Sequence, residues 1–163
     1  MNTKNKIMKT AKIGRITAQV LYILSIVAFV TFTVLAIVLP CTNAIKALKP
    51  AEAAIIFAVL ALYAFFIFGL LWNVQQFFGA IEKQQTVFNE QSGKYLKKSA
   101  IFTIVVAFVP AIVGSVLMHA IVPASEFVFR IEIVGVITGA MLMLVGLFFQ
   151  YGKELQKSDD ETL

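Results

Sequence analysis

Histidine and cysteine are almost absent from this sequence of 163 residues, which has one of each, His119 and Cys41. A single cysteine excludes a disulfide within the chain, so cysteine usage does not identify a redox compartment. A single histidine excludes a metal site built from several histidines. We therefore interpret His119 first as a hydrogen-bonded residue near a membrane interface, and only second as a ligand.

Charged residues are also scarce, at 14% of the sequence, whereas hydrophobic residues make up 60%. These values lie well outside the range of soluble globular proteins. A soluble fold of this size has no interior large enough for so much apolar surface. The composition therefore predicts a membrane protein.

Four uncharged apolar stretches define the architecture, since about 20 residues are needed to cross about 30 Å of hydrocarbon. They predict an all-α, integral membrane four-helix transmembrane bundle that forms a single domain, residues 1–163. The first stretch is much longer than the core of a secretory signal, which favours a retained helix. The four stretches are Ile16–Leu39, Ala53–Ile81, Ala100–Val122 and Ile133–Gly152.

The distribution of Lys and Arg predicts the orientation, because these residues are retained on the cytoplasmic side of a membrane. Eleven of the 14 lie in the amino-terminal segment, the middle connection (82–99) and the tail (153–163), and three lie in the two other connections. Both termini are therefore predicted to be cytoplasmic. The formal charge of +5 then indicates attraction to an anionic inner leaflet. Direct nucleic-acid binding is not predicted, because no basic motif interleaved with aromatics accompanies these cations.

Two features predict how the helices meet and end. Gly135 and Gly139 form a GxxxG pair, a spacing that lets two backbones approach closely in lipid. The partner is another helix of the same chain or, in a homo-oligomer, a second copy. The second stretch alternates apolar and polar residues at helical spacing beyond Trp72, which predicts an amphipathic extension past the membrane edge. The apolar set is Val74, Phe77, Phe78 and Ile81, and the polar set is Asn73, Gln75, Gln76, Glu82 and Lys83.

Residues suited to chemistry are few. His119, Glu126, Arg130 and Glu132 could form a small polar cluster facing outward, although a solvated helix start explains them more simply. The sequence shows no nucleophile with its base, no phosphate-binding glycine loop and no paired carboxylates within a stretch. Neither an enzyme nor a cofactor is predicted.

Two segments resemble a known family. The first, Ile81–Ser92 (IEKQQTVFNEQS) followed by Leu96-Lys97-Lys98, resembles a turn of the type Gly-x-Pro-Phe that precedes Glu, Asn and a Leu-Arg-Lys run. The second is Tyr151-Gly152-Lys153-Glu154-Leu155-Gln156, with a terminal Asp160-Glu161-Thr162-Leu163. Both resemble domain of unknown function 2975, a family of small bacterial proteins with four membrane helices. The chain departs from the pattern at Val87, where the family favours Pro, and at Ser92, where it favours Asn.

The resemblance implies a location in the bacterial plasma membrane but no activity. Relatives are often encoded beside a helix-turn-helix regulator, which implies a membrane-bound modulator of a cytoplasmic transcription regulator. A small transport, channel or immunity-type membrane protein is the alternative. The placement of polar residues at span ends favours the modulator, because a conduit needs ionisable groups inside the bilayer.

If the middle connection and the tail pack together, Phe88 would be their apolar anchor, and Lys94, Lys97 and Lys98 could pair with Asp159, Asp160 and Glu161. The expected partners are the lipid bilayer and a cytoplasmic regulatory protein. The candidate interaction residues are Phe88, Glu90, Lys94, Lys97, Lys98, Gly152, Leu155, Gln156, Asp160 and Thr162.

Overall fold

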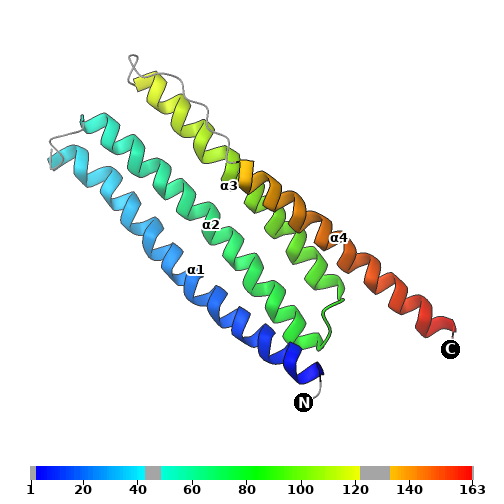
Figure 1. Ribbon diagram of the computed structural model, residues 1–163. Coiled ribbons are helices and arrows are strands. Elements are labelled where there is room, and N and C mark those ends of the chain that lie inside the picture. The colour runs from blue at the N-terminus through cyan, green and yellow to red at the C-terminus, as the bar shows by residue number, and fades with distance from the viewer. Residues whose placement is uncertain (1–2, 43–48, 122–132, 163) are drawn as a thin grey trace.

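The computed structural model describes residues 3–42, 49–121 and 133–162, and over these residues it consists of four long helices without strands (Figure 1). All four are long and apolar enough to cross a membrane. The predicted all-α, four-helix membrane architecture is confirmed. The helices are α1 (Thr3–Thr42), α2 (Pro50–Gln84), α3 (Glu90–Ile121) and α4 (Ile133–Thr162).

The helices extend well beyond the predicted spans. At about 1.5 Å per residue, the 40 residues of α1 measure about 60 Å, roughly twice the hydrocarbon thickness. Much of the amino-terminal segment, the middle connection and the tail is therefore helical, with only residues 85–89 left outside the helices in the middle connection. Lys, Gln and Glu, which are common in these segments, are good helix formers.

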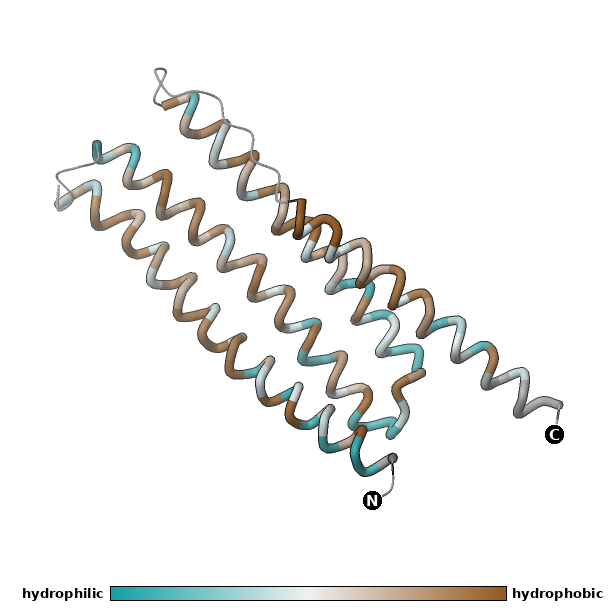
Figure 2. Tube along the Cα trace, viewed as in Figure 1, coloured by the Kyte–Doolittle hydropathy of each residue, from teal (hydrophilic) through white to brown (hydrophobic). Residues whose placement is uncertain are grey.

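The added turns gather at the end of the molecule where both termini lie (Figure 1). We call residues 3–15, 82–99 and 153–162 the polar end. Figure 2 shows hydrophilic residues concentrated there, while the middle of each helix is mostly hydrophobic. The side of the membrane on which this end lies stays a prediction from the cation distribution.

The helices pack in chain order: α1 against α2, α2 against α3, and α3 against α4. Among the described residues, α1 and α4 do not pack against each other, so the bundle is open. The main neighbour of α1 is α2, and that of α4 is α3.

Small residues form the contacts between helices. Ala11, Ala18 and Ser25 are buried at intervals of seven residues along α1, and Ala100 and Ala107 are buried on α3. Large apolar side chains point outward instead, and at most 17% of the most apolar window of any helix is buried inside the protein. This arrangement suits lipid, where close backbone approach stabilises helix pairs and apolar burial does not.

Polar side chains within the spans bond mainly to their own helix. The Asn73 Nδ2 donates to the carbonyl of Gly69 at 2.8 Å, and four hydroxyls donate to carbonyls three or four residues earlier. One of them, Thr103, donates to the Ser99 carbonyl at 2.9 Å. The helix α3 continues through the buried Pro110.

The fourth helix is displaced along α3 toward the polar end. If the third and fourth spans were level, Gly152 would lie beside Ala100. Gly152 instead contacts Phe88, which corresponds to a shift of about 18 Å at 1.5 Å per residue. Small residues explain the shift, because Gly139 lies against Ala100, and Gly146 lies against Gly93. The carboxyl-terminal half of α4 therefore lies beside the polar start of α3.

Candidate functional site

A short turn organises the polar end. Gln85 ends α2 in the left-handed conformation, with φ at 55°, and its N–H donates to the Ile81 carbonyl at 2.9 Å. Asn89 then caps α3, because its Oδ1 accepts a hydrogen bond from the Ser92 backbone N–H at 2.7 Å. The Asn89 Nδ2 also donates to the Thr86 carbonyl at 3.0 Å. The turn is tight although Val87 stands where the resembled family favours Pro.

The turn contacts α4 through Phe88. The rings of Phe88 and Phe149 lie 5.4 Å apart, and Phe149 in turn lies 5.9 Å from Phe77 of α2. A Cβ built on Gly152 would come within 2.8 Å of the Phe88 ring. Gly152 therefore leaves a notch that the ring fills. The structure brings together these two residues from the connection and the tail.

A second contact holds α4 one to two turns away. The Lys97 Nζ donates to the Gln150 Oε1 at 2.6 Å, and this pair is partly buried. Gly93 and Gly146 meet beside it, with a Cβ on either one less than 4 Å from the other's carbonyl oxygen. The connection between α2 and α3 and the lower half of α4 thus form one packed unit.

The structure describes other partners for the three lysines that were expected to pair with the acidic tail. Lys94 pairs with Glu90 at 2.7 Å, one turn away on α3, and Lys97 binds Gln150. Lys98 lies over the Tyr95 ring, 6.0 Å from its centroid. Two of these partners lie on α3 itself, within one turn of the lysine, whereas Gln150 lies on α4. The pairing with the acidic tail stays a prediction. The side chains of Gln156, Asp159, Asp160, Glu161 and Thr162 lie outside the described part of the chain.

The predicted glycine pair lies on α4, and one of its members meets α3. Gly139 is buried against α3, and a Cβ there would lie 2.5 Å from the Ile104 Cγ1 and 3.1 Å from the Ala100 oxygen. Gly135 is half-buried.

The predicted outward polar cluster is not assembled by the described residues. His119 is exposed near the end of α3, and Glu126, Arg130 and Glu132 lie outside the described part of the chain.

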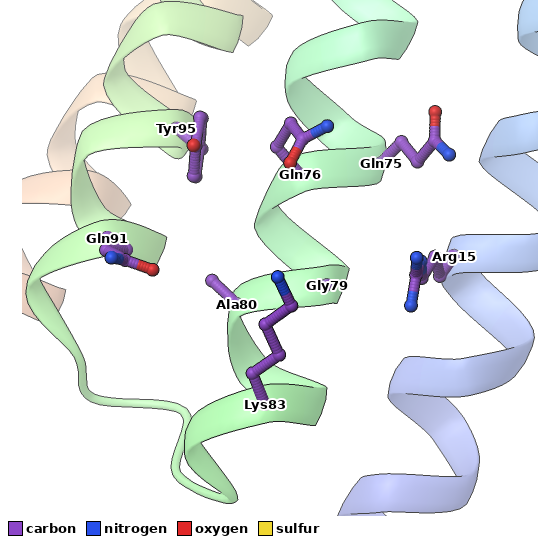
Figure 3. Close-up of a pocket in the computed structure, with 8 residues that line it drawn as sticks. All are labelled: Arg15, Gln75, Gln76, Gly79, Ala80, Lys83, Gln91 and Tyr95. Carbon is purple, nitrogen blue, oxygen red and sulfur yellow. The ribbon is translucent and has the colours of Figure 1, made fainter.

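A polar cavity at the polar end was missed by sequence reasoning. It holds about 250 Å³ and lies over one face of α2, between α1 and α3 (Figure 3). The sequence indicates this cavity only through the polar side of the predicted α2 extension, which includes Gln75, Gln76 and Lys83. The cavity is lined by Arg15, Gln75, Gln76, Gly79, Ala80, Lys83, Gln91 and Tyr95.

An ion pair fixes one wall of this cavity. The Arg15 Nη1 donates to the Glu82 Oε2 at 3.0 Å, which joins α1 to the last turn of α2. The two side chains remain 43% and 30% exposed, so the pair orients Arg15 more than it stabilises the fold. Figure 3 shows Arg15 reaching from α1 toward α2, with Gln91 and Tyr95 on the α3 side.

An apolar stripe on α4 runs from the last turns of the fourth span, Ile133–Gly152, into the polar end. Phe148, Tyr151 and Leu155 are 69%, 60% and 52% exposed, at helical spacing on one side of α4. Because α4 is displaced, this stripe lies at or beyond the level of the α3 turn that carries Lys94 and Lys97. Large apolar side chains therefore face outward where the neighbouring helix is polar.

Comparison with protein-family models, with curated proteins and with solved structures gives no match. The resemblance to domain of unknown function 2975 therefore stays a prediction.

Proposed function

We propose that this chain is a membrane-embedded interaction protein that binds a cytosolic protein at the inner face of the bacterial plasma membrane. A transcription regulator is the partner class implied by the family resemblance. The observation that carries the proposal is the uncovered stripe of Phe148, Tyr151 and Leu155 beside the polar start of α3. An exposed apolar stripe rimmed by polar residues is typical of a protein-binding surface.

The stripe is suited to docking because its helix is held in place. Phe88 fills the notch at Gly152, and Lys97 binds Gln150, on the side of α4 that faces α3. The opposite side can therefore receive a partner without rearranging the bundle. Apolar anchors at helical spacing, with charges along the rim, are a common way for a helix to bind a groove on another protein.

Binding of a partner explains the distribution of polarity better than conduction does. Asn73 and the hydroxyls of Ser25, Thr33, Thr103 and Thr138 bond to carbonyls of their own helices. Groups engaged in this way do not offer a polar path across the bilayer. Polarity gathers instead at the end that carries both termini.

The test is recovery of partners from gently solubilised membranes, quantified by mass spectrometry and repeated with purified components. The parent protein should retain a cytosolic protein in nearly the same molar amount as itself. We expect Leu155→Ser and Tyr151→Ser each to lose that protein. The matched control is Ile13→Ser, because Ile13 is 57% exposed on α1 at the same end. Removing residues 157–163 should also weaken binding while membrane insertion persists.

Two results would contradict the proposal. If both stripe variants retain every protein that the parent binds, the stripe is not the docking surface. If a cysteine placed at Leu155 cross-links efficiently to a second copy in native membranes, the occupant is another molecule of this chain. The homo-oligomer would then be the correct interpretation of the stripe.

A further inference from the structure

One face of α2 carries a stripe that is aromatic within the span and polar at its end. Its members follow one another at intervals of three or four residues, so they lie on the same side of the helix. On α1, Tyr22 lies against this face, with its ring 4.8 Å from Phe68 and 5.6 Å from Trp72. The stripe consists of Phe65, Phe68, Trp72, Gln76, Gly79 and Lys83.

The polar part of this stripe is the floor of the cavity, and its charge is positive. Arg15 and Lys83 are the charged residues among its lining, and no acidic residue lines it. Lys83 has no hydrogen-bond or ion-pair partner among the residues that the structure describes. Arg15 uses Nη1 on Glu82, which leaves other N–H groups of its five-donor guanidinium for an anion. A phosphate group matches both cations, because Arg binds it through two parallel bonds and Lys as a point charge.

Gln75 also lines the cavity, but its Oε1 is covered by neighbouring atoms and has no hydrogen-bond partner among the described residues. The two cations, and not this acceptor, therefore define the ligand as a molecule that carries a phosphate group.

The depth of the cavity indicates a molecule of the membrane. Arg15 directly precedes the first apolar residue of the first span, and Lys83 follows Ile81, the last apolar residue of the second. The cavity thus lies where hydrocarbon meets headgroups. Its volume of about 250 Å³ falls below that of pockets for drug-sized ligands but accommodates a small headgroup.

We propose that the cavity binds the headgroup of an anionic glycerophospholipid whose acyl chains lie along Trp72, Phe68 and Phe65. Basic pockets between transmembrane helices are known to bind such headgroups. Trp72 and Phe65 are 46% and 48% exposed, so the aromatic surface is open to an acyl chain. This site involves α1, α2 and α3 and is independent of the stripe on α4.

Trp72 is the only tryptophan of the chain, which provides a direct measurement. The full chain is reconstituted into phosphatidylcholine vesicles that contain a small fraction of lipid with brominated acyl chains, which quench tryptophan on contact. We expect brominated phosphatidylglycerol to bind beside Trp72 about fivefold more tightly than brominated phosphatidylcholine, the factor expected for one free cation.

Two variants and a control test the cavity itself. Lys83→Gln should reduce the preference for phosphatidylglycerol about fivefold by removing the cation without an ion-pair partner. Gly79→Leu should reduce it by filling the cavity, since the nearest atom to a Cβ at Gly79 is the Arg15 Nε, 3.8 Å away. Lys9→Gln removes one exposed charge from the same end, outside the cavity, and should keep the preference.

Three results would overturn the inference. Equal quenching by the two brominated lipids in the parent means that no anionic headgroup is selected. An equal loss in Lys9→Gln means that overall surface charge causes the preference. Displacement of brominated phosphatidylglycerol by glycerol 3-phosphate at millimolar concentration, lost in Lys83→Gln, would show that the cavity holds a soluble phosphate compound instead.

Discussion

Individual glycines decide where α3 and α4 meet. Gly139 and Gly146 are separated by seven residues and both are buried against α3. The backbone oxygen of Ala100 lies beside the first of them, and that of Gly93 beside the second. A Cβ at Gly139 would lie 2.5 Å from the Ile104 side chain and 3.1 Å from the Ala100 oxygen, which cannot move aside as a flexible side chain can. A Cβ at Gly146 would lie 3.0 Å from the Lys97 side chain, with backbone at ordinary contact distance. These two residues therefore set both the distance and the register of the helix pair.

Gly139→Ala should lower the stability of the protein in detergent by about 1–3 kcal/mol, the usual cost of overpacking. The matched change is Gly79→Ala, where the Cβ meets Arg15 at 3.8 Å, an ordinary contact distance. This variant should be neutral or slightly stabilising, because Ala is favoured over Gly in a helix by about 1 kcal/mol. Unfolding followed by circular dichroism distinguishes the two. Equal midpoints for both variants would mean that Gly139 faces lipid.

The sequence indicated these positions only in part. The GxxxG motif indicated Gly135 and Gly139. The two glycines of α4 that are buried against α3 are Gly139 and Gly146. A spacing of four residues is typical of one crossing geometry, whereas a shallow crossing repeats its contacts every seven residues. The spacing alone could not decide between the two, because the partner helix and its small residues were unknown.

At the scale of elements, the turn of residues 85–89 links three helices. Gln85 ends α2, Asn89 begins α3, and Phe88 between them packs on α4. The cap is a local feature, yet its geometry places Phe88 opposite the notch at Gly152. A loss of the cap should therefore affect the seating of α4 as well as the start of α3.

Asn89→Ala should destabilise the protein by about 1 kcal/mol, the typical cost of an N-cap, with the loss of the partly buried hydrogen bond to Thr86 adding to it. The control is Asn5→Ala, because Asn5 is exposed within α1. Thermal unfolding in a fixed detergent measures both. Asn89→Ala that unfolds at the parent temperature would show that Phe88 and Gly152 hold the turn without the cap.

The element boundaries separate what the sequence predicts well from what it does not. Apolar stretches such as Ile133–Gly152 predicted the spans, because their length and lack of charge are set by the bilayer. The same criterion could not predict that α3 begins at Glu90, since helices outside the membrane are limited by caps rather than by hydropathy. The displacement of α4 depends on the match between its glycines and the small residues Gly93 and Ala100 of α3, which neither segment encodes alone.

At the scale of the whole molecule, four helices with both termini at one end predict a definite topology. Cys41 is exposed near the far end of α1, and Ser158 lies on α4 at the polar end. In intact cells an impermeant thiol reagent should label Cys41. A chain with Cys41→Ser and Ser158→Cys should be labelled only after lysis. The reverse pattern would place the polar end outside the cell and would contradict the cation rule for this protein.

The polar cavity forms only where three helices come together. Arg15, Gly79 and Tyr95 come from three helices, and each is unremarkable within its own segment. Composition and periodicity identify the polar side of α2 but not which residues of α1 and α3 stand opposite it. That information depends on helix register, which is set by packing.

The order in which the helices pack bears on how the protein is made. Each helix packs against the one synthesised just before it, so nearly every tertiary contact joins helices that follow one another in the chain. Low contact order favours rapid folding, and amino-terminal segments emerge from the ribosome first. The pair α1 and α2 can associate in the bilayer before α3 is translated, and α4 completes an arrangement that already exists. Assembly can therefore proceed vectorially, with no early helix waiting exposed for a distant partner.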